Sequence, residues 1–334
     1  MIETRSAKRK SNHQNQPNKK KRIVLGELPN STNLIAPQKS LKNLNPRKPT
    51  PGKKNKIPSE DFDVPVVSSV YMHLRSMEME KKKRPMMDYM VIVQRDITPH
   101  MRGILIDWLV EVAEEYKLVP DTLHLAVSYI DRFLSFNDIN RTKLQLLGVS
   151  SMLIASKHEE ISPPYVEEFC FITDNSYNKV EVLEMEANIL KTLEFDTANP
   201  TVKTFLRRFN DIACEKKNVS SLQFEFLSNY LAELSLLDCV CLRFLPSLVA
   251  ASVTLLARFI VWPKASPWTP ALQEYSRYKP DELKECVLIL HDLYMARREA
   301  SFDASREKYK QHKFKHVANL PSPPLLPSSL FEVE

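Results

Sequence analysis

Glycine is scarce in this chain of 334 residues, which has four where average usage predicts roughly 23. The four lie too far apart for any glycine-rich phosphate loop, so Walker, Rossmann and protein-kinase nucleotide sites are excluded. Hairpins and strand–helix turns also favour glycine, because it adopts positive φ without a steric cost. The shortage therefore predicts an all-α fold. The glycines are Gly26, Gly52, Gly103 and Gly148.

The cysteines are few, odd in number and scattered, and no pair has zinc-binding spacing. They are therefore predicted to be small buried thiols in a reducing compartment. No apolar run approaches the ~20 residues that span a bilayer, and no apolar core follows the basic N-terminus. These absences predict an intracellular protein without a metal, cofactor or membrane anchor. The cysteines are Cys170, Cys214, Cys239, Cys241 and Cys286.

Residues 1–60 lack phenylalanine, tryptophan and tyrosine but hold seven prolines. They carry 15 lysines and arginines against three acids, a formal +12, so the remainder of this +6 chain sums to −6. Such a segment cannot bury enough apolar surface to offset its conformational entropy, so we predict a disordered regulatory tail. The mildly acidic remainder argues against direct binding of nucleic acid.

Two basic clusters in this tail have the spacing of a bipartite nuclear import signal. We therefore expect recognition by an import carrier and a nuclear location, with shuttling to the cytoplasm left open. A solvated tail that brushes nucleic acid is the alternative. The clusters are Lys8, Arg9 and Lys10, then Lys19, Lys20, Lys21 and Arg22.

Apolar residues recur at helical spacing from about residue 65 onward. The stretch 142–158 is apolar on nearly every face, which predicts a buried central helix, and Gly148 there would let a neighbouring helix approach closely. A second small-and-apolar stretch, 249–257, follows about one domain length later, so we predict two copies of a five-helix unit. The other predicted helices are a leading helix at 65–79, one from Met101, one at 123–134 with Asp121 as N-cap, one that Ser162 caps with Pro163 at N1, and one at 178–193.

This pattern divides the chain into five segments. The series of helices restarts after Asn199-Pro200, which separates two folded domains. We predict the tail at 1–60, a leading helix and linker at 61–100, a first domain at 101–197, a second at 198–320, and a flexible Pro/Ser-rich tail at 321–334.

Several motifs in the first domain occur in an order that resembles the cyclin box, and the match extends over 65–320. The sequences EEYKL at 114–118 and LAELSLL at 231–237 resemble A-type mitotic cyclins in a plant-like form, and the LxCxE motif typical of D-type cyclins is missing. The resemblance implies two consecutive cyclin boxes. It also implies a non-catalytic activator of a cyclin-dependent serine/threonine kinase that acts between S phase and mitosis. The motifs are Met101–Val112, Tyr129–Leu134, Leu153–Lys157, Glu159–Glu160 and Lys191–Phe195.

Two other classes of function stay open at this point. An enzyme would need a paired nucleophile and base, whereas the histidines are scattered and His158-Glu-Glu is not an HExxH zinc site. A cyclin-fold scaffold that binds DNA-bound partners, and no kinase, would be expected to have a basic folded part, whereas this one sums to −6.

The resemblance implies a kinase-binding surface around Lys157 and Glu186, which match cyclin positions that hydrogen-bond and ion-pair with the kinase. Without the resemblance, they would be an ordinary surface pair worth under about 1 kcal/mol. Further matches to this contact surface are Leu153, Glu159, Ile189 and Phe195. The residue types depart from the usual cyclin ones at Ser69, His73, His158 and Thr197, so weaker activation or a different choice of kinase is expected.

A stripe with i, i+3, i+4, i+7 spacing lies on the helix that begins at Met101. From its spacing alone it would be core. In cyclins the matching stripe stays exposed and takes the apolar residue of an Arg-x-Leu motif in substrates and inhibitors, while a glutamate holds the arginine. The resemblance therefore implies a docking patch of Met101, Ile104, Leu105, Trp108, Glu111 and Gln145, with Leu109 and Val112 as core residues on the other face.

Arg102 and Asp131 match a buried ion pair that braces the first helix of a cyclin box against the second. Removing one partner would leave the other charge uncompensated, at a cost of about 3–5 kcal/mol. The pair is therefore predicted to be structural.

Within the tail, a nine-residue segment matches the four signature positions of a mitotic cyclin destruction box, at Arg22, Leu25, Leu28 and Asn30. The match implies recognition by a ubiquitin ligase of the anaphase-promoting type, for which a disordered tail would be accessible. The sequence Thr50-Pro51-Gly52-Lys53 fits the proline-directed pattern that such kinases prefer, so Thr50 is a predicted phosphorylation site. A chance Thr-Pro pair is the alternative.

Overall fold

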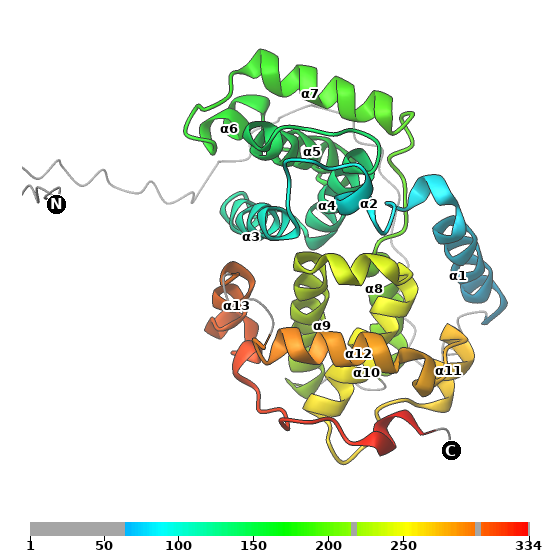
Figure 1. Cartoon of the computed structure of the whole chain (residues 1–334). Helices are drawn as coiled ribbons and strands as arrows, with labels where there is room; N and C mark the ends of the chain where they lie inside the picture. Colours follow the sequence, from blue (N-terminus) through cyan, green and yellow to red (C-terminus); the bar gives the residue numbers. More distant parts are fainter. Residues whose placement is uncertain (1–63, 215–218, 298–301, 333–334) are drawn as a thin grey trace, which may run out of the picture. The chain divides into compact units, whose positions relative to one another are not determined.

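The structure is a computed structural model that describes residues 64–214, 219–297 and 302–332. The predicted disordered tail, with the import clusters, the destruction box and Thr50, lies outside these residues. The regular elements of the described part are all helical, which confirms the all-α prediction (Figure 1). The predicted leading helix is present as α1, Val64–Met79.

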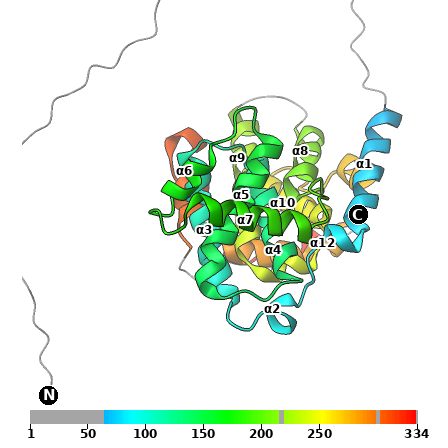
Figure 2. The ribbon, with the colours of Figure 1, turned by 90° about the horizontal axis from the view of Figure 1, so that it is seen from above.

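The first domain is built around helix α5, Leu144–Glu159, which packs against the other four helices of the domain. Its residues from Leu146 to Ser156 are all buried, as expected of a helix that is apolar on nearly every face. Figure 1 shows α7 lying over α5, and Figure 2 shows the same pair from above. The other helices are α3 (Pro99–Glu115), α4 (Pro120–Leu134), α6 (Val166–Phe171) and α7 (Lys179–Thr192), with the short α2 (Tyr89–Ile92) before them.

The second domain repeats this order of helices, which confirms the predicted duplication. Its central helix is α10, Pro246–Val261, which packs against α8, α9 and α12. The fourth helix is short in both domains, with six residues in α6 and seven in α11. The flanking helices are α8 (Val202–Ala213), α9 (Val219–Leu237), α11 (Pro270–Ser276) and α12 (Pro280–Tyr294), followed by α13 (Ala304–Tyr309).

Two predicted helix starts are wrong, and proline explains both. Asp121 is not the N-cap of α4, because Pro120 already occupies the first helical position and Val119 precedes it. Ser162 does not cap α6, which begins only at Val166. Pro164 disfavours the α region at Pro163, and Pro163 does the same at Ser162, so the chain between α5 and α6 is not helical here.

The leading helix α1 packs on the second domain. The Tyr71 hydroxyl donates to the Ser276 carbonyl at 2.7 Å. Glu78, which is 1% exposed, accepts hydrogen bonds from the Ser247 backbone N–H at 3.0 Å and hydroxyl at 2.6 Å. Residues 64–79 therefore belong structurally with the helices that come last in the chain.

The segment after Pro321 is also packed, so the predicted flexible tail at 321–334 is wrong for its described part. Leu330 and Phe331 are 6% and 7% exposed, in a 3₁₀ turn (Ser328–Phe331) that contacts α12. The Lys284 ammonium lies 5.8 Å from the centre of the Phe331 ring. Two apolar side chains near the end of the chain are enough to fasten a segment that is otherwise rich in proline and serine.

Among the described residues, no helix has the length and apolar character needed to cross a membrane.

Candidate functional site

The last turn of α5 and the middle of α7 bring the two expected kinase-binding residues together. Lys157 Nζ lies 2.6 Å from Glu186 Oε1, and the two side chains are 48% and 13% exposed. The lysine also lies at a helix C-terminus, where a positive charge is favourable. The two residues expected together from the sequence are thus an ion pair in the structure.

Two further residues of the expected surface are buried. Leu153 is 1% exposed and Ile189 is fully buried, both in the first domain's core. Leu153 lies one turn before Lys157 in α5, and Ile189 lies one turn after Glu186 in α7. Their assignment as surface contacts is wrong, because α5 and α7 pack against each other and both side chains belong to the core.

Phe195 is exposed, and the backbone that carries it is strained. The Phe195 N–H donates to the Leu190 carbonyl at 2.9 Å and the Glu194 N–H donates to the Lys191 carbonyl at 3.1 Å, which is the Schellman pattern that ends a helix. That pattern normally uses glycine, yet Glu194 and Phe195 have φ of 55° and 57°. Left-handed backbone costs each such residue about 1–3 kcal/mol. The result is an aromatic side chain that is 73% exposed.

The turn after Phe195 is anchored from inside the domain. The Asp196 carboxylate binds the ammonium groups of Lys83 and Lys82, and Arg132 donates to the Asp196 carbonyl at 3.1 Å. Partial burial acts to raise the pKa of Asp196, but the hydrogen bonds from Lys83 and Lys82 outweigh it and leave the pKa below its usual value. The Tyr129 hydroxyl donates to the Thr197 carbonyl at 3.0 Å. Phe195 is therefore displayed on a fixed turn.

Ile161, which was not expected at the site, is fully exposed in the segment between α5 and α6. It follows His158 and Glu159, which are exposed and lie 3.1 Å apart between Nδ1 and Oε1. An isoleucine within a run of charged residues just before two prolines was the available signal. We use the name α5–α7 rim for the set Lys157, Glu159, Ile161, Glu186 and Phe195.

The expected docking patch on α3 is only partly exposed. Ile104 is 49% exposed and Glu111 is exposed, whereas Met101, Trp108 and Gln145 are half-buried. A cavity of about 270 Å³ lies beside Trp108 and Glu111, with Tyr116, Phe171 and Ile172 also in its wall. Leu109 and Val112 are buried, as predicted.

Leu105 does not belong to the exposed part of this patch. It is 5% exposed, and a Cβ added at Gly148 would meet its Cδ1 at 2.7 Å. The expected exposure of Leu105 is therefore wrong, because the glycine in α5 lets α3 approach until the leucine fills the space. The predicted role of Gly148 in close helix packing is confirmed.

Arg102 and Asp131 form the predicted buried pair. Arg102 Nε lies 2.6 Å from Asp131 Oδ1 and Nη2 lies 2.7 Å from Oδ2, with side-chain exposures of 1% and 2%. The Tyr89 hydroxyl donates to Oδ1 at 2.7 Å, and Arg102 Nη1 donates to the Leu236 carbonyl of α9 at 2.8 Å. The pair thus braces α3 against α4 and also reaches the second domain.

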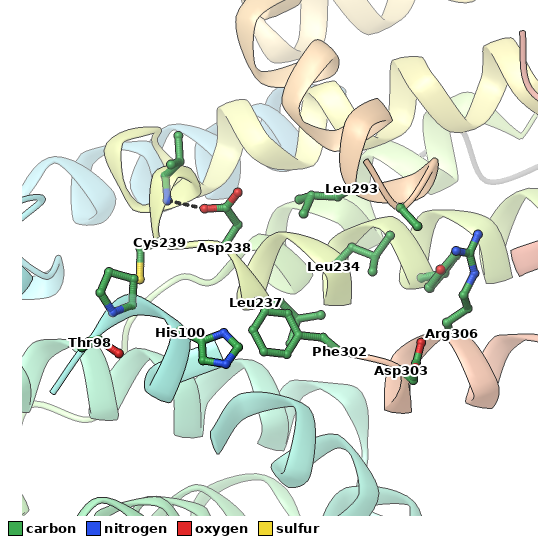
Figure 3. A pocket seen from close by; sticks show the side chains of 14 residues that line it. Thr98, His100, Leu234, Leu237, Asp238, Cys239, Leu293, Phe302, Asp303 and Arg306 are labelled. Carbon is green, nitrogen blue, oxygen red and sulfur yellow. Dashed lines mark hydrogen bonds between the residues drawn. The ribbon is translucent and has the colours of Figure 1, made fainter. Parts of the chain in front are cut away.

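A cavity of about 500 Å³ lies where the start of α3 meets the ends of α9 and α12 (Figure 3). The Asp238 carboxylate in its wall accepts from the Val240 N–H at 2.8 Å, and Arg306 donates to the Tyr294 carbonyl at 3.2 Å. The described residues contain no group of three histidine, cysteine or acidic side chains placed to hold a metal ion. Since both of these polar groups bind backbone atoms, we assign the cavity to the joint between the domains.

The sequence and the fold both match known proteins. Residues 69–198 match the family described as Cyclin, N-terminal domain, and residues 200–323 match Cyclin, C-terminal domain. Cyclin-A3-4 of Arabidopsis thaliana is 52% identical over 335 residues, which cover 95% of this chain and 90% of the relative. The G2/mitotic-specific cyclin C13-1 of Daucus carota is 53% identical over 332 residues, which cover 95% and 97%. The X-ray structure of a viral cyclin from herpesvirus saimiri has the same fold, with a TM-score of 0.59 and 22% identity over 67% of this chain and 96% of its own.

Proposed function

The chain belongs to the cyclin family, since both domains of the family match it, and we propose that its α5–α7 rim binds and activates a cyclin-dependent serine/threonine kinase. Its relatives include A-type cyclins of plants, in agreement with the motifs in the sequence. Cyclins are non-catalytic regulatory subunits of kinases, so this chain is a regulator and not itself an enzyme.

Activation of such a kinase is a conformational problem. The kinase's Lys–Glu ion pair and metal-binding aspartate align only when its αC helix and activation segment take the active arrangement. A protein that binds this arrangement more tightly shifts the population toward it without supplying a catalytic group. A shift from 1:99 to 99:1 needs a preference of about 5.5 kcal/mol.

The α5–α7 rim is the observation that carries the proposal. Burying an exposed apolar side chain such as Phe195 or Ile161 contributes about 1.5–3 kcal/mol. A kinase that buries both only in its active arrangement would gain a preference close to the required one. Lys157 and Glu186 add charged hydrogen-bonding groups to the same rim. Phe195 is also displayed on a strained turn, and such strain is concentrated at functional sites.

The test is a pull-down of cyclin-dependent kinase with a histone phosphorylation assay. Lys157→Ala with Glu186→Ala is expected to abolish the co-purifying activity, because the rim loses its charged contacts. The matched control is Lys179→Ala with Glu167→Ala, an exposed pair in the same domain at 2.7 Å, which should activate as the wild type does. A folded Lys157/Glu186 variant that still activates fully would refute the assignment.

We further propose that α3 recruits substrates that carry an Arg-x-Leu motif. The half-buried Trp108 and exposed Ile104 offer apolar surface, and the cavity of about 270 Å³ beside them can take an apolar side chain. Glu111 at its wall supplies a carboxylate for the arginine. Leu105 supports this surface from beneath.

Trp108→Ala is expected to weaken the docking of Arg-x-Leu substrates by 2 kcal/mol or about 30-fold, because an aromatic anchor can dominate such a contact. The measurement is the phosphorylation rate of matched peptides with and without the motif. Peptides without it should react as before. If both classes lose activity equally, or the variant unfolds, Trp108 is a structural residue and the docking proposal fails.

We also propose that the protein is nuclear, acts between S phase and mitosis, and is degraded through the ubiquitin system. The support is the sequence pattern of residues 8–30 and the relative named a G2/mitotic-specific cyclin. A fluorescent fusion followed through cell division tests location and half-life together. Replacing Arg22 and Leu25 by alanine is expected to prolong its life without changing its location.

A further inference from the structure

Five serine or threonine residues in the described part of the chain precede proline, and four of them use their hydroxyl group structurally. Two are N-caps that accept backbone hydrogen bonds, and two others bond a carbonyl or an imidazole. These four are Thr98 (Met101 N–H, 3.2 Å), Thr269 (Leu272 N–H, 3.3 Å), Ser266 (Trp268 carbonyl, 3.1 Å) and Ser322 (His291 Nε2, 3.0 Å). The fifth, Ser162, is exposed, and its hydroxyl makes no hydrogen bond to any described residue.

Ser162 also lies in a non-helical segment between α5 and α6 that is anchored at both ends. Glu160 Oε1 accepts from the Val119 N–H at 2.8 Å and the Thr122 hydroxyl at 2.6 Å, and the Tyr165 N–H donates to Glu168 Oε2 at 2.7 Å. Between these anchors, the two prolines hold the chain out of the helical region. Ile161 is fully exposed and Tyr165 is 78% exposed. The Ser162 hydroxyl is therefore presented to solvent in an anchored, non-helical loop, where it can reach a nucleotide phosphate.

We propose that Ser162 is a phosphorylation site for a proline-directed serine/threonine kinase, and that the phosphate weakens binding at the α5–α7 rim. Ser162 Oγ forms a bond to the γ-phosphorus of ATP, the bond from that phosphorus to the β–γ bridging oxygen breaks, and ADP leaves. The hydroxyl proton passes to the catalytic aspartate of the modifying kinase. The second half of this inference rests on the proposed function, whereas the modification itself does not.

The position of Ser162 explains the expected direction of the effect. A phosphate adds about −1.5 to −2 charge at neutral pH. It would adjoin Ile161, whose burial the rim requires, and a hydrated dianion makes that burial costly. Glu159, Glu160, Glu167 and Glu168 already place four carboxylates in the same stretch of chain, so the phosphate also adds to like charge.

The site is tested on the full chain, incubated with a purified mitogen-activated protein kinase and ATP and mapped by mass spectrometry. Phosphate is expected on Ser162, lost in Ser162→Ala and retained in the matched control Ser322→Ala. Thr50, in the same sample, reports that the kinase is active on this chain. A sample with Thr50 modified and Ser162 unmodified would overturn the site.

The consequence is tested in a Thr50→Ala background, so that Ser162 phosphate is the only difference between two preparations. Surface plasmon resonance against a cyclin-dependent kinase should show at least tenfold weaker binding after phosphorylation. Affinity that stays within twofold, or rises, overturns the regulatory effect. If the unmodified chain does not bind the kinase at all, the proposed function fails with the regulatory effect, whereas the mapping still decides the site.

Discussion

The central helices of the two domains each carry a cationic side chain near their C-terminal end, which is exposed in the first domain and buried in the second. In α5, Lys157 is half exposed and its ammonium binds Glu186 on the surface. In α10, Arg258 is 8% exposed and donates to the carbonyls of Ala213 at 2.6 Å, Pro267 at 3.1 Å and Ser266 at 3.1 Å. The equivalent helix therefore leaves its cation at the surface in the first domain and buries it against backbone carbonyls in the second.

This contrast shows why the first domain carries the proposed function. A buried guanidinium that satisfies three backbone carbonyls cannot leave them without exposing unpaired groups, so it is unavailable to a partner. An exposed ammonium with one carboxylate neighbour can exchange that neighbour at little cost. The fold places a cation at the same end of both central helices, and the burial of that cation determines whether another protein can bind it.

The largest loss of stability is expected when the buried ion pair between Arg102 and Asp131 is broken by Asp131→Ala. It is expected to destabilise the protein by about 3–5 kcal/mol, because the buried Arg102 guanidinium loses its only carboxylate partner among the described residues and the Tyr89 hydroxyl loses its acceptor. The free energy of unfolding, measured in urea, gives the value. Asp138→Ala, which removes an exposed acid 3.8 Å from Arg95, is the control and should cost under about 1 kcal/mol. Equal losses for the two variants would contradict the structural role.

Arg258→Ala is expected to cost about 2–3 kcal/mol, because three carbonyls lose a donor and Trp262 loses the cation 5.3 Å from its ring centre. Thermal and urea unfolding measure the loss. The matched control is Arg207→Ala, since Arg207 is 58% exposed and pairs with Asp121 at the surface. If Arg258→Ala leaves stability unchanged but weakens kinase binding, the contrast between the domains is broken.

His124 extends the contrast to a group that is buried without charge. It is 3% exposed, and burial, helped by Lys203 and Lys308, lowers its pKa to about 3 from an ordinary value of 6.5. Below pH 6.5 the unfolded chain therefore takes up a proton that the folded chain refuses. This contribution should reduce stability as pH falls from 6.5 toward 3, by about 1.4 kcal/mol per pH unit.

The measurement is the free energy of unfolding between pH 6.5 and pH 4.5, for wild type and His124→Gln. The free energy of unfolding of the variant should fall less steeply with decreasing pH than that of wild type, by about 1.4 kcal/mol per pH unit, which corresponds to one proton. This difference in slope does not depend on the stability of the variant at pH 7. Identical slopes would show that His124 is protonated in the folded protein, or that another group accounts for the acid sensitivity.

The smallest effect on stability is expected for Lys157→Ala with Glu186→Ala. Loss of a partly exposed pair should change the free energy of unfolding by under about 1 kcal/mol, although the same variant is expected to lose kinase activation. Circular dichroism and urea unfolding supply the measurement. A loss of several kcal/mol would mean that the pair holds α5 to α7, and the difference from Arg258 would disappear.

Much of the candidate site follows from the sequence, but not the exposure of its members. The motifs identified Lys157, Glu186 and Phe195, which lie at the surface, together with Leu153 and Ile189, which do not. Helical spacing shows that residues share a face, and it cannot show which neighbouring helix covers that face. Ile161 was missed for a related reason, because an apolar residue in a loop is usually covered by something and here it is not.

The amino-acid sequence alone was sufficient for the all-α fold, the duplicated five-helix unit, the central helices and the pairing of Arg102 with Asp131. The fold class, the duplication and the central helices depend on composition and periodicity, which are local or repeated properties of the chain, whereas the ion pair was implied by the resemblance to cyclins. Only the tertiary structure decided that Leu105 fills the space over Gly148, that the tail near Phe331 packs on α12, and that Phe195 faces solvent. Each of these depends on how closely segments distant in the sequence approach each other. A side chain is buried only where another segment packs over it, and its own residue type does not determine that.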